Sequence, residues 1–174
     1  MSSLAVSVSD EDHAQGLPRA AVTLLEYGDY QCPYCGQAYP IIKEIQTAMG
    51  RKLRFVFRNF PLTQAHPYAE LAAEAAESAA VDGKFWEMHD ALYENQAMLS
   101  EDAVMEIARK LGLDLSRFVE DIRTRKFMNH VRKDFMGGVK SGVNGTPCFF
   151  INGKRHDAPW DYETLSKSLI SVGK

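Results

Sequence analysis

The sequence predicts an α/β fold in which a central sheet is interrupted by a block of helices. Three observations lead to this prediction. Strand-like apolar runs at 21–27 and 53–60 flank a segment with helical spacing, an alanine-rich stretch fills the middle of the chain, and strand character returns at 148–151. The element order is therefore βαβ, several helices and then ββα, so each part of the sheet needs the other to be complete.

Composition and charge exclude several classes of protein. With 174 residues, 45% of them hydrophobic, the chain can bury one core and has little room for a second. The net charge is −3, and the 20 basic and 23 acidic residues form no long run of one sign, so nucleic acid is not an expected partner. No stretch approaches the roughly 20 apolar residues of a membrane span.

The start of the chain bears on its location. Residues 1–20 lack the basic start, the apolar stretch and the small-residue cleavage site of a secretory signal. We therefore expect a cytoplasmic protein, or a periplasmic one if a signal peptide was removed. The location matters because each compartment imposes its own redox poise.

The first part of the chain has the pattern of a parallel βαβ unit. Residues 21–27 form an apolar run that suits a buried strand, and Gly28 breaks it. Residues 37–50 repeat apolar side chains at three-to-four spacing, as in a helix. Residues 53–60 have the period of a half-buried strand, which Pro61 ends. Two strands joined by a helix imply parallel pairing.

Residues 66–138 have helical character throughout. The run 69–81 is rich in alanine and glutamate, which have high helix propensity. Ser100 and Asp114 are residue types that cap helix N-termini, and Gly112 ends the helix between them. We expect four or five helices in this block.

The last part of the chain predicts a hairpin and a helix. Residues 148–151 form an apolar strand, and Asn152-Gly153 after it is a strong signal for a tight hairpin turn. Asp161 then caps a final helix whose apolar side chains share one face. The hairpin completes the sheet that the first strands begin.

The tetrapeptide Cys32-Pro33-Tyr34-Cys35 stands at the start of the first helix. Free N–H groups and the positive dipole end of a helix stabilise a thiolate at Cys32, whereas Cys35 lies one turn further in. Pro33 suits the first helical position, because its missing N–H would have no partner there. Thiol–disulfide exchange needs an attacking thiolate and a resolving thiol, so the spacing predicts Cys32 as the first and Cys35 as the second.

Zinc binding is the alternative use of a Cys-x-x-Cys pair. Structural zinc usually needs a second such pair, or paired histidines at ligand spacing, and neither is present. The histidines are instead scattered along the sequence, as His13, His66, His89, His130 and His156. We therefore expect neither a metal nor another cofactor.

Two further segments complete the candidate site. Glu26 is an acid in an otherwise apolar strand, where a buried carboxyl could accept protons from Cys35; the alternative is an exposed carboxylate at the strand end. Thr146-Pro147 stands just before the strand at 148–151, and a proline there leaves adjacent backbone groups free for another chain. From the sequence alone, a trans peptide bond before Pro147 is the commoner case.

A resemblance to a known family rests on two segments, LLEYGDYQCPYC and GVNGTPCFFING. With the alanine-rich block between them, they resemble the DsbA-like thiol–disulfide oxidoreductases of the thioredoxin superfamily. The resemblance implies a thioredoxin fold, a mixed central sheet flanked by helices, with an inserted all-helical domain. The implied parts are an N-terminal extension at 1–20, a thioredoxin-fold domain at 21–65 and 139–174, and the helical domain at 66–138.

The resemblance also implies roles for individual residues. Cys32 is implied as the nucleophile and Cys35 as the resolving thiol, with Pro147 as a cis-proline that faces Cys32. Glu26 matches the family's buried acid, and Arg58 falls near the place of a basic partner for it. The implied substrate-binding residues are Pro33, Tyr34, Thr146 and Pro147.

The sequence departs from the family pattern at the active site. Pro-Tyr replaces the Pro-His of the strongly oxidising periplasmic members and places no cation beside Cys32, so we expect a moderate oxidant at most. Cys148 follows the implied cis-proline, where many relatives have a small residue such as threonine. One interpretation is a buried apolar filler of the strand. The other is a third active-site thiol close to Cys32, which resolves mixed disulfides or joins the pair around a soft metal.

The predicted function is disulfide exchange with protein or small-thiol substrates, which requires a redox recycling partner. The alternative is a redox-sensing or partner-binding module of the same fold. For that alternative Phe85 and Trp86 could mark a partner surface, although both residues also suit a core. The intact tetrapeptide together with Glu26 favours turnover.

Overall fold

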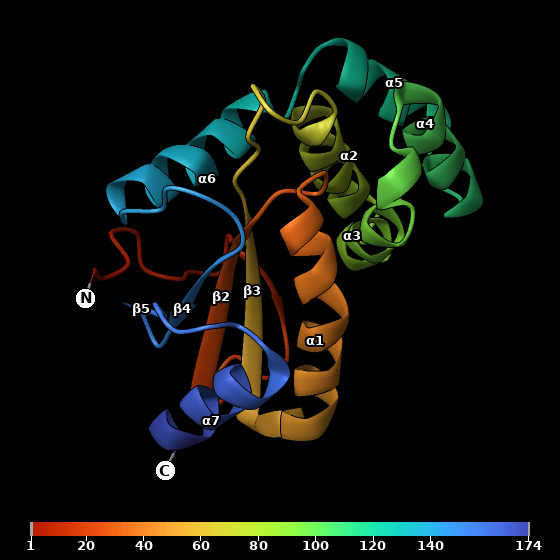
Figure 1. Ribbon diagram of the computed structural model, residues 1–174. Coiled ribbons are helices and arrows are strands. Elements are labelled where there is room, and N and C mark those ends of the chain that lie inside the picture. Colours follow the sequence, from red (N-terminus) through yellow and green to blue (C-terminus); the bar gives the residue numbers. More distant parts are fainter. Residues whose placement is uncertain (1, 174) are drawn as a thin grey trace.

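A five-stranded mixed sheet forms the centre of the protein (Figure 1). The computed structural model describes residues 2–173. The strands lie in the order β1 (His13–Gln15), β3 (Leu53–Asn59), β2 (Val22–Gly28), β4 (Cys148–Ile151) and β5 (Lys154–Arg155). β2 and β3 pair in parallel, and the other neighbours are antiparallel. The predicted α/β class with a parallel βαβ unit is confirmed.

Helices cover both faces of this sheet. α1 (Pro33–Met49) and α7 (Tyr162–Val172) pack on one face, where Leu24 and Phe55 belong to the larger core. α6 (Met128–Lys140) lies across the other face, where Phe135 packs on the smaller core that contains Leu25 and Val56 (Figure 1). Because side chains alternate along a strand, neighbouring residues of β2 enter different cores.

Strand β3 is buried on both faces, so the prediction of a half-buried strand is wrong. Of its seven residues only Arg54 is partly exposed, and Arg58 is 4% exposed. The sequence period is real, but it distinguishes two covered faces rather than a core face and a solvent face. The second face of β3 is covered by α6 and by the N-terminal segment, and the sequence pattern of β3 cannot predict either contact.

The inserted block contains five α-helices, which agrees with the expected number. They are α2 (Ala69–Val81), α3 (Phe85–Glu94), α4 (Glu101–Lys110), α5 (Leu115–Arg123) and α6. A short 3-10 helix in the block, η2 (Gln96–Met98), follows α3, and another outside the block, η1 (Gly50–Lys52), precedes β3. Ser100 caps α4 and Asp114 caps α5, as predicted. Phe85 is buried and Trp86 packs against the same core, so they do not form an exposed partner surface.

The predicted hairpin between β4 and β5 is confirmed. Asn152 and Gly153 both have positive φ, at 46° and 79°, as the tightest hairpin turn requires. Ile151 therefore pairs directly with Lys154. Asp161 accepts a hydrogen bond from the Thr164 N–H and so caps α7.

The N-terminal segment is part of the sheet rather than a free extension. Its edge strand β1 pairs antiparallel with β3, with His13 opposite Phe57. Leu4 and Val8 pack into the smaller core beside α6. A three-residue strand without apolar alternation carries no period, so the sequence pattern could not predict it.

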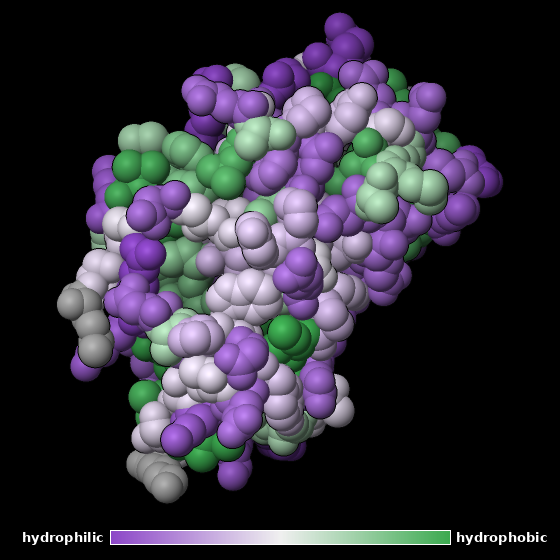
Figure 2. Space-filling view, in the orientation of Figure 1, coloured by the Kyte–Doolittle hydropathy of each residue, from purple (hydrophilic) through white to green (hydrophobic). Residues whose placement is uncertain are grey.

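The surface over α6 is partly apolar. Figure 2 shows apolar side chains there, where Met136 and Val139 are about half exposed. None of the helices in residues 2–173 has the length and apolar character that a membrane span requires.

Candidate active site

The two cysteines of the tetrapeptide lie at the N-terminus of α1, just beyond the end of β2. Cys32 is the N-cap residue, and Pro33 is the first helical residue. The first turn of α1 contains no acidic side chain that would oppose the positive end of the helix dipole. Both cysteines are free thiols; Cys32 is 4% exposed and Cys35 is fully buried.

Asp29 holds the turn between β2 and α1. Its buried carboxylate accepts hydrogen bonds from the Gln31 N–H at 2.8 Å, from the Leu62 N–H at 2.9 Å and from His66 Nδ1 at 2.7 Å. The Cys32 N–H donates to the Asp29 carbonyl at 3.1 Å. Because one carboxylate joins two segments of the chain, the turn is held in place before any substrate binds.

Gln96 in η2 joins the helical block to the same turn. Its Nε2 donates to the carbonyl of Tyr30 at 2.8 Å and to the carbonyl of Cys32 at 2.9 Å. Gly36 in α1 leaves room for this side chain, because a Cβ at Gly36 would clash with Gln96 Oε1. The helical block thus supports the backbone of the attacking cysteine.

The surroundings of Cys32 favour its thiolate. A hydrogen bond from the Cys35 thiol outweighs burial and, with further bonds from Thr146 and the backbone N–H groups of Cys35 and Tyr34, lowers the pKa of Cys32 to about 5. In the thiol form, Cys32 Sγ donates to the Thr146 carbonyl at 3.4 Å. At neutral pH Cys32 is therefore mainly a thiolate, which is the species that attacks disulfides.

Cys35 and Glu26 keep their protons to much higher pH. Burial, the hydrogen bond with Cys32 and the Glu26 charge raise the pKa of Cys35 well above its ordinary value. Glu26 on β2 is 3% exposed, and burial, followed by the Cys32 charge, raises its pKa to about 8. The interpretation of Glu26 as an exposed strand-end carboxylate is therefore wrong. A buried acid beside a buried thiol can exchange protons with it as the pair reacts.

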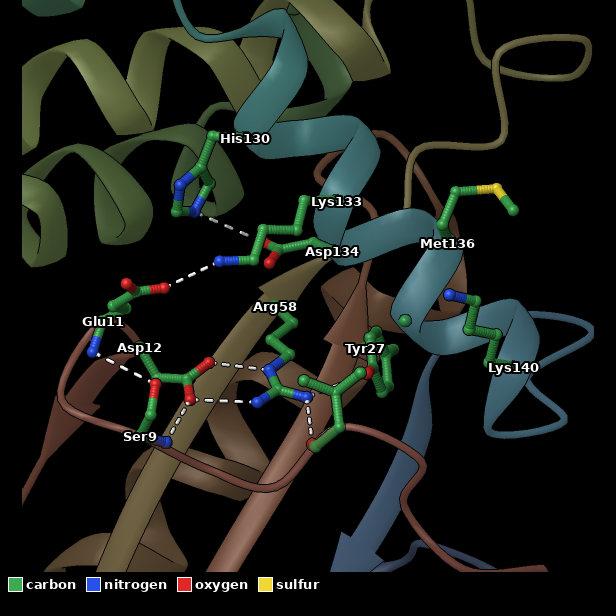
Figure 3. A pocket seen from close by; sticks show the side chains of 12 residues that line it. Ser9, Glu11, Asp12, Tyr27, Arg58, His130, Lys133, Asp134, Met136 and Lys140 are labelled. Carbon is green, nitrogen blue, oxygen red and sulfur yellow. Dashed lines mark hydrogen bonds and ion pairs between the residues drawn. The ribbon is translucent and has the colours of Figure 1, made fainter.

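Arg58 is not the basic partner of Glu26, contrary to the expectation from the family. In the β2–β3 register Arg58 stands beside Tyr27, whereas Glu26 stands beside Phe57, so the two side chains face opposite sides of the sheet. The guanidinium binds Asp12 through Nε at 2.7 Å and through Nη2 at 3.0 Å (Figure 3). Arg58 therefore does not lower the pKa of Glu26.

Thr146 and Pro147 lie beside the Cys32 thiol. The peptide bond between them is cis. The Thr146 hydroxyl is buried and has no other hydrogen-bond partner within residues 2–173, so it can donate to the Cys32 sulfur when that is a thiolate. Pro33 is exposed and Tyr34 is 62% exposed on the outer side of the tetrapeptide. Cys32 thus lies between an exposed dipeptide and the backbone at the start of β4.

Cys148 lies on the other face of the sheet from the tetrapeptide. It pairs with Tyr27 and packs in the smaller core, whereas Cys32 and Cys35 belong to the larger core under α1. Burial raises the pKa of the Cys148 thiol. This placement supports the interpretation of Cys148 as a core filler over that of a third active-site thiol. Although Cys148 follows the cis-proline in the sequence, its side chain points away from Cys32.

Sequence reasoning missed three residues that build the site: Asp29, His66 and Gln96. Asp29 directly follows the Gly28 strand break and could have been found, because aspartate commonly binds the backbone N–H two residues further on. His66 and Gln96 reach the turn from distant segments and carry no spacing signal. Their contacts follow from the way the helical block packs against α1.

Comparison with known proteins identifies the family. The thioredoxin family model matches residues 8–170. The chain belongs to the thioredoxin family. The chain is 45% identical over 163 residues to the Na(+)/H(+) antiporter NhaA 3 of Salinispora tropica, an alignment that covers 94% of this chain and 25% of that protein. The chain spans about a quarter of the length of the curated relatives it matches.

Solved structures share the whole fold. BdbD from Bacillus subtilis superposes with a TM-score of 0.86 and 23% identity, over 99% of both chains. A thioredoxin-like oxidoreductase from Silicibacter pomeroyi superposes with a TM-score of 0.80 and 27% identity, over 94% of this chain and 93% of that one. The predicted thioredoxin fold and the predicted membership of the thioredoxin superfamily are confirmed.

Proposed function

We propose that this protein catalyses thiol–disulfide exchange with protein substrates, Cys32 attacking and Cys35 resolving. The observation that carries the proposal is the opposite protonation of two thiols one helical turn apart. The pKa of Cys32 is lowered to about 5, and that of Cys35 is raised well above its ordinary value. One thiol is thus ready to attack at neutral pH, while the other stays protonated until the second step. The similarity to the Silicibacter pomeroyi oxidoreductase agrees with this proposal.

The exchange takes two displacement steps. The Cys32 thiolate attacks a substrate disulfide, a bond forms between Cys32 and one substrate sulfur, and the other substrate sulfur leaves as a thiolate. Deprotonated Cys35 then attacks the Cys32 sulfur, the Cys32–Cys35 disulfide forms, and the second substrate thiolate leaves. Two electrons pass from the protein to the substrate, and a redox recycling partner returns them. The reverse sequence oxidises a substrate dithiol.

Glu26 is the proposed base for the second step. In the resting dithiol the charge of Cys32 helps to keep the Glu26 carboxyl protonated. Formation of the mixed disulfide removes that charge, so the pKa of Glu26 falls and the carboxyl ionises more readily. Glu26 then becomes a base at the moment when Cys35 has to lose its proton.

The proposed substrate site is the backbone beside Pro147. Thr146 and Pro147 lie against Cys32 at the start of β4, and a proline leaves neighbouring backbone groups unpaired. An extended substrate segment can bind there as an added strand, through its main chain rather than through particular side chains. The exposed Pro33 and Tyr34 border the same place. Such a site accepts many protein sequences.

An insulin-reduction assay with a thiol reductant as recycling partner tests the proposal. Cys32→Ser is expected to abolish turnover, and Cys35→Ser is expected to accumulate a mixed disulfide that mass spectrometry detects. Cys148→Ser is the matched control, because its side chain faces the other core, and it should keep activity within about twofold. Full activity of Cys32→Ser would overturn the proposal.

The similarity to the antiporters favours a second candidate, a redox-sensing module that acts on a linked transporter. In that case the tetrapeptide would change between dithiol and disulfide without repeated turnover on other proteins. Slow single-turnover reaction with insulin, together with rapid oxidation by small disulfides, would support the sensing role over the enzyme.

A further inference from the structure

We propose that His13, Glu77 and His130 bind a divalent transition-metal ion of zinc's type, with Asp134 beside them. The three ligand side chains come from β1, α2 and α6, and their ligand atoms all lie within 4.8 Å of one another. This group lies outside the disulfide-exchange site, and the exchange reaction does not use it. The sequence indicated no metal, because the two histidines are far apart along the chain and only the fold brings them together.

The separations of the donor atoms suit one small ion. His130 Nε2 lies 3.5 Å from Glu77 Oε1 and 3.8 Å from Asp134 Oδ2. Ligand atoms bound tetrahedrally to zinc at about 2.0–2.1 Å lie about 3.4 Å apart. His13 Nε2 lies closer, at 2.7 Å from Glu77 Oε2, where it donates a hydrogen bond. A metal ion would replace that proton, and these two atoms would need to separate by about 0.7 Å.

The charges of the group also require a cation. The side chains of Glu77 and Asp134 are 4% and 12% exposed, and within residues 2–173 histidines are their only basic ion-pair partners. Asn59 bridges the two carboxylates, because its Nδ2 donates to Glu77 Oε1 at 2.8 Å and to Asp134 Oδ2 at 3.1 Å. Two buried carboxylates held this close repel each other, and a divalent ion between them and the histidines neutralises both.

Neighbouring residues fix the ligands in place. The ring of His13 stacks on Phe85, with centroids 3.6 Å apart and planes 9° apart. Asn59 orients both carboxylates, and the Asn59 N–H donates to Asp134 Oδ2 at 3.0 Å. His130 and Asp134 stand one turn apart on α6, on the same face of the helix. Such supporting contacts are typical of metal sites, where they hold the ligands ready.

A cavity gives the group access to solvent. It has a volume of about 330 Å³, and His130 and Asp134 form part of its wall. Figure 3 shows both side chains on α6 at the edge of this cavity, above the pair that Lys133 forms with Glu11. An ion can therefore enter without unfolding of the surrounding helices, and a water molecule has room to complete its coordination.

The donor set selects the class of metal. Two imidazole nitrogens and carboxylate oxygens suit zinc and its first-row neighbours, whereas calcium and magnesium prefer oxygen ligands alone. The bound ion would tie edge strand β1 to α2 and α6, and so join the N-terminal segment to the helical block. Its expected role is therefore structural, with an effect on folding stability rather than on the disulfide reaction.

Metal titration of a thiol-free protein tests the proposal. The full chain is used with the substitutions Cys32→Ser, Cys35→Ser and Cys148→Ser, so that no thiol can bind the metal. A chelator first removes any metal already bound. We expect one Zn²⁺ per chain by calorimetry and the intense visible bands of low-symmetry, four- or five-coordinate Co²⁺. A hundredfold excess of Zn²⁺ over its dissociation constant should raise the melting temperature by about 5 to 10 °C.

Further variants in the same background identify the ligands. His130→Asn should weaken Zn²⁺ binding about a hundredfold or more, and Asn59→Ala, which removes only an orienting contact, about 10- to 100-fold. His156→Gln is the matched control, because within residues 2–173 the His156 side chain is hydrogen-bonded only to the Pro159 carbonyl, and it should bind as the parent does. Circular dichroism checks that each variant is folded. Absence of zinc binding, equal binding by His130→Asn, or Ca²⁺ binding as tight as that of Zn²⁺ would overturn the proposal.

Discussion

Glu26 shows how a single position in a strand can carry an unusual acid. It faces the larger core between α1 and the sheet, where burial and the Cys32 charge raise its pKa to about 8. The Gly28 Cα lies close by, since a Cβ there would stand 3.0 Å from Glu26 Oε1. The same Cβ would clash with the Phe57 ring, so the absence of a side chain at Gly28 leaves the space that this ring and the carboxyl occupy. The acid is tolerated because it stays neutral over most of the physiological range.

Glu26→Gln is expected to stabilise the protein at alkaline pH. The unfolded chain loses this proton near pH 4.5 and the folded chain only near 8, so the folded state binds more protons between these values. Stability of the parent protein therefore falls as pH rises through this window and is constant above it. In the oxidised form Cys32 carries no charge, so burial alone keeps the pKa of Glu26 raised and the window ends below pH 8. There the Glu26→Gln variant should lack this loss and be more stable than the parent by less than about 4 kcal/mol at pH 8.

Denaturant unfolding of both proteins across the pH range measures the difference. It should grow from about zero at acidic pH to its full value near pH 8, because the glutamate and the glutamine are equivalent only while Glu26 is protonated. A difference that does not change with pH would show that Glu26 titrates normally in the folded protein.

At the scale of elements, η2 packs against the start of α1 through complementary residues, Gln96 in η2 and Gly36 in α1. The Gln96 amide donates to two carbonyls of the active-site turn, and its Oε1 occupies the space beside Gly36. Glycine inside a helix usually costs stability relative to alanine. Its presence here is explained by the glutamine, which needs that space to support the backbone of Cys32.

A double-mutant cycle tests this match. Gly36→Ala alone should displace Gln96 and cost about 1 to 2 kcal/mol, with slower attack of Cys32 on a small disulfide. In a Gln96→Ala background the same change should stabilise the protein by about 0.5 to 1 kcal/mol, because only the helix propensity of alanine remains. Equal effects of Gly36→Ala in both backgrounds, measured by urea unfolding, would contradict the coupling.

At the scale of the whole molecule, the N-terminal segment closes the second face of the sheet. Arg58 projects from β3 into this layer, donates twice to Asp12, and also donates to the carbonyls of Val6 and Ser7. The segment before β1 is thereby attached to the centre of the sheet, on the face away from the tetrapeptide. The contacts that hold the N-terminal segment and the cysteines that carry the redox chemistry thus lie on opposite faces of the sheet.

Asp12→Ala is expected to cost about 3 to 5 kcal/mol, because it leaves the buried Arg58 charge without its carboxylate. Thermal unfolding measures this loss. The neighbouring Glu11→Ala is the matched control, since Glu11 forms an exposed pair with Lys133, and its removal should leave the melting temperature close to that of the parent. Neither change should alter the pH at which Cys32 becomes reactive toward iodoacetamide. A change in that pH with Asp12→Ala would mean that the two faces are coupled.

Local features could be predicted from the sequence alone. The cysteine pair at a helix start, the caps at Ser100 and Asp161, and the Asn152-Gly153 turn all depend on residues within a few positions of one another. The βαβ order and the helical block follow in the same way from period and composition. These features persist because the backbone hydrogen bonds that define them are local.

Only the tertiary structure decided which side chains share a face of the sheet. The pairing of Arg58 with Asp12, the burial of Glu26, the position of Cys148 in the smaller core, and the meeting of His13 with His130 all depend on which element covers each face. Strand periodicity separates two faces but does not say what covers them. The thiol pair was therefore readable from the sequence, whereas the acid beneath it and the proposed metal ligands required the packing of segments that lie far apart in the chain.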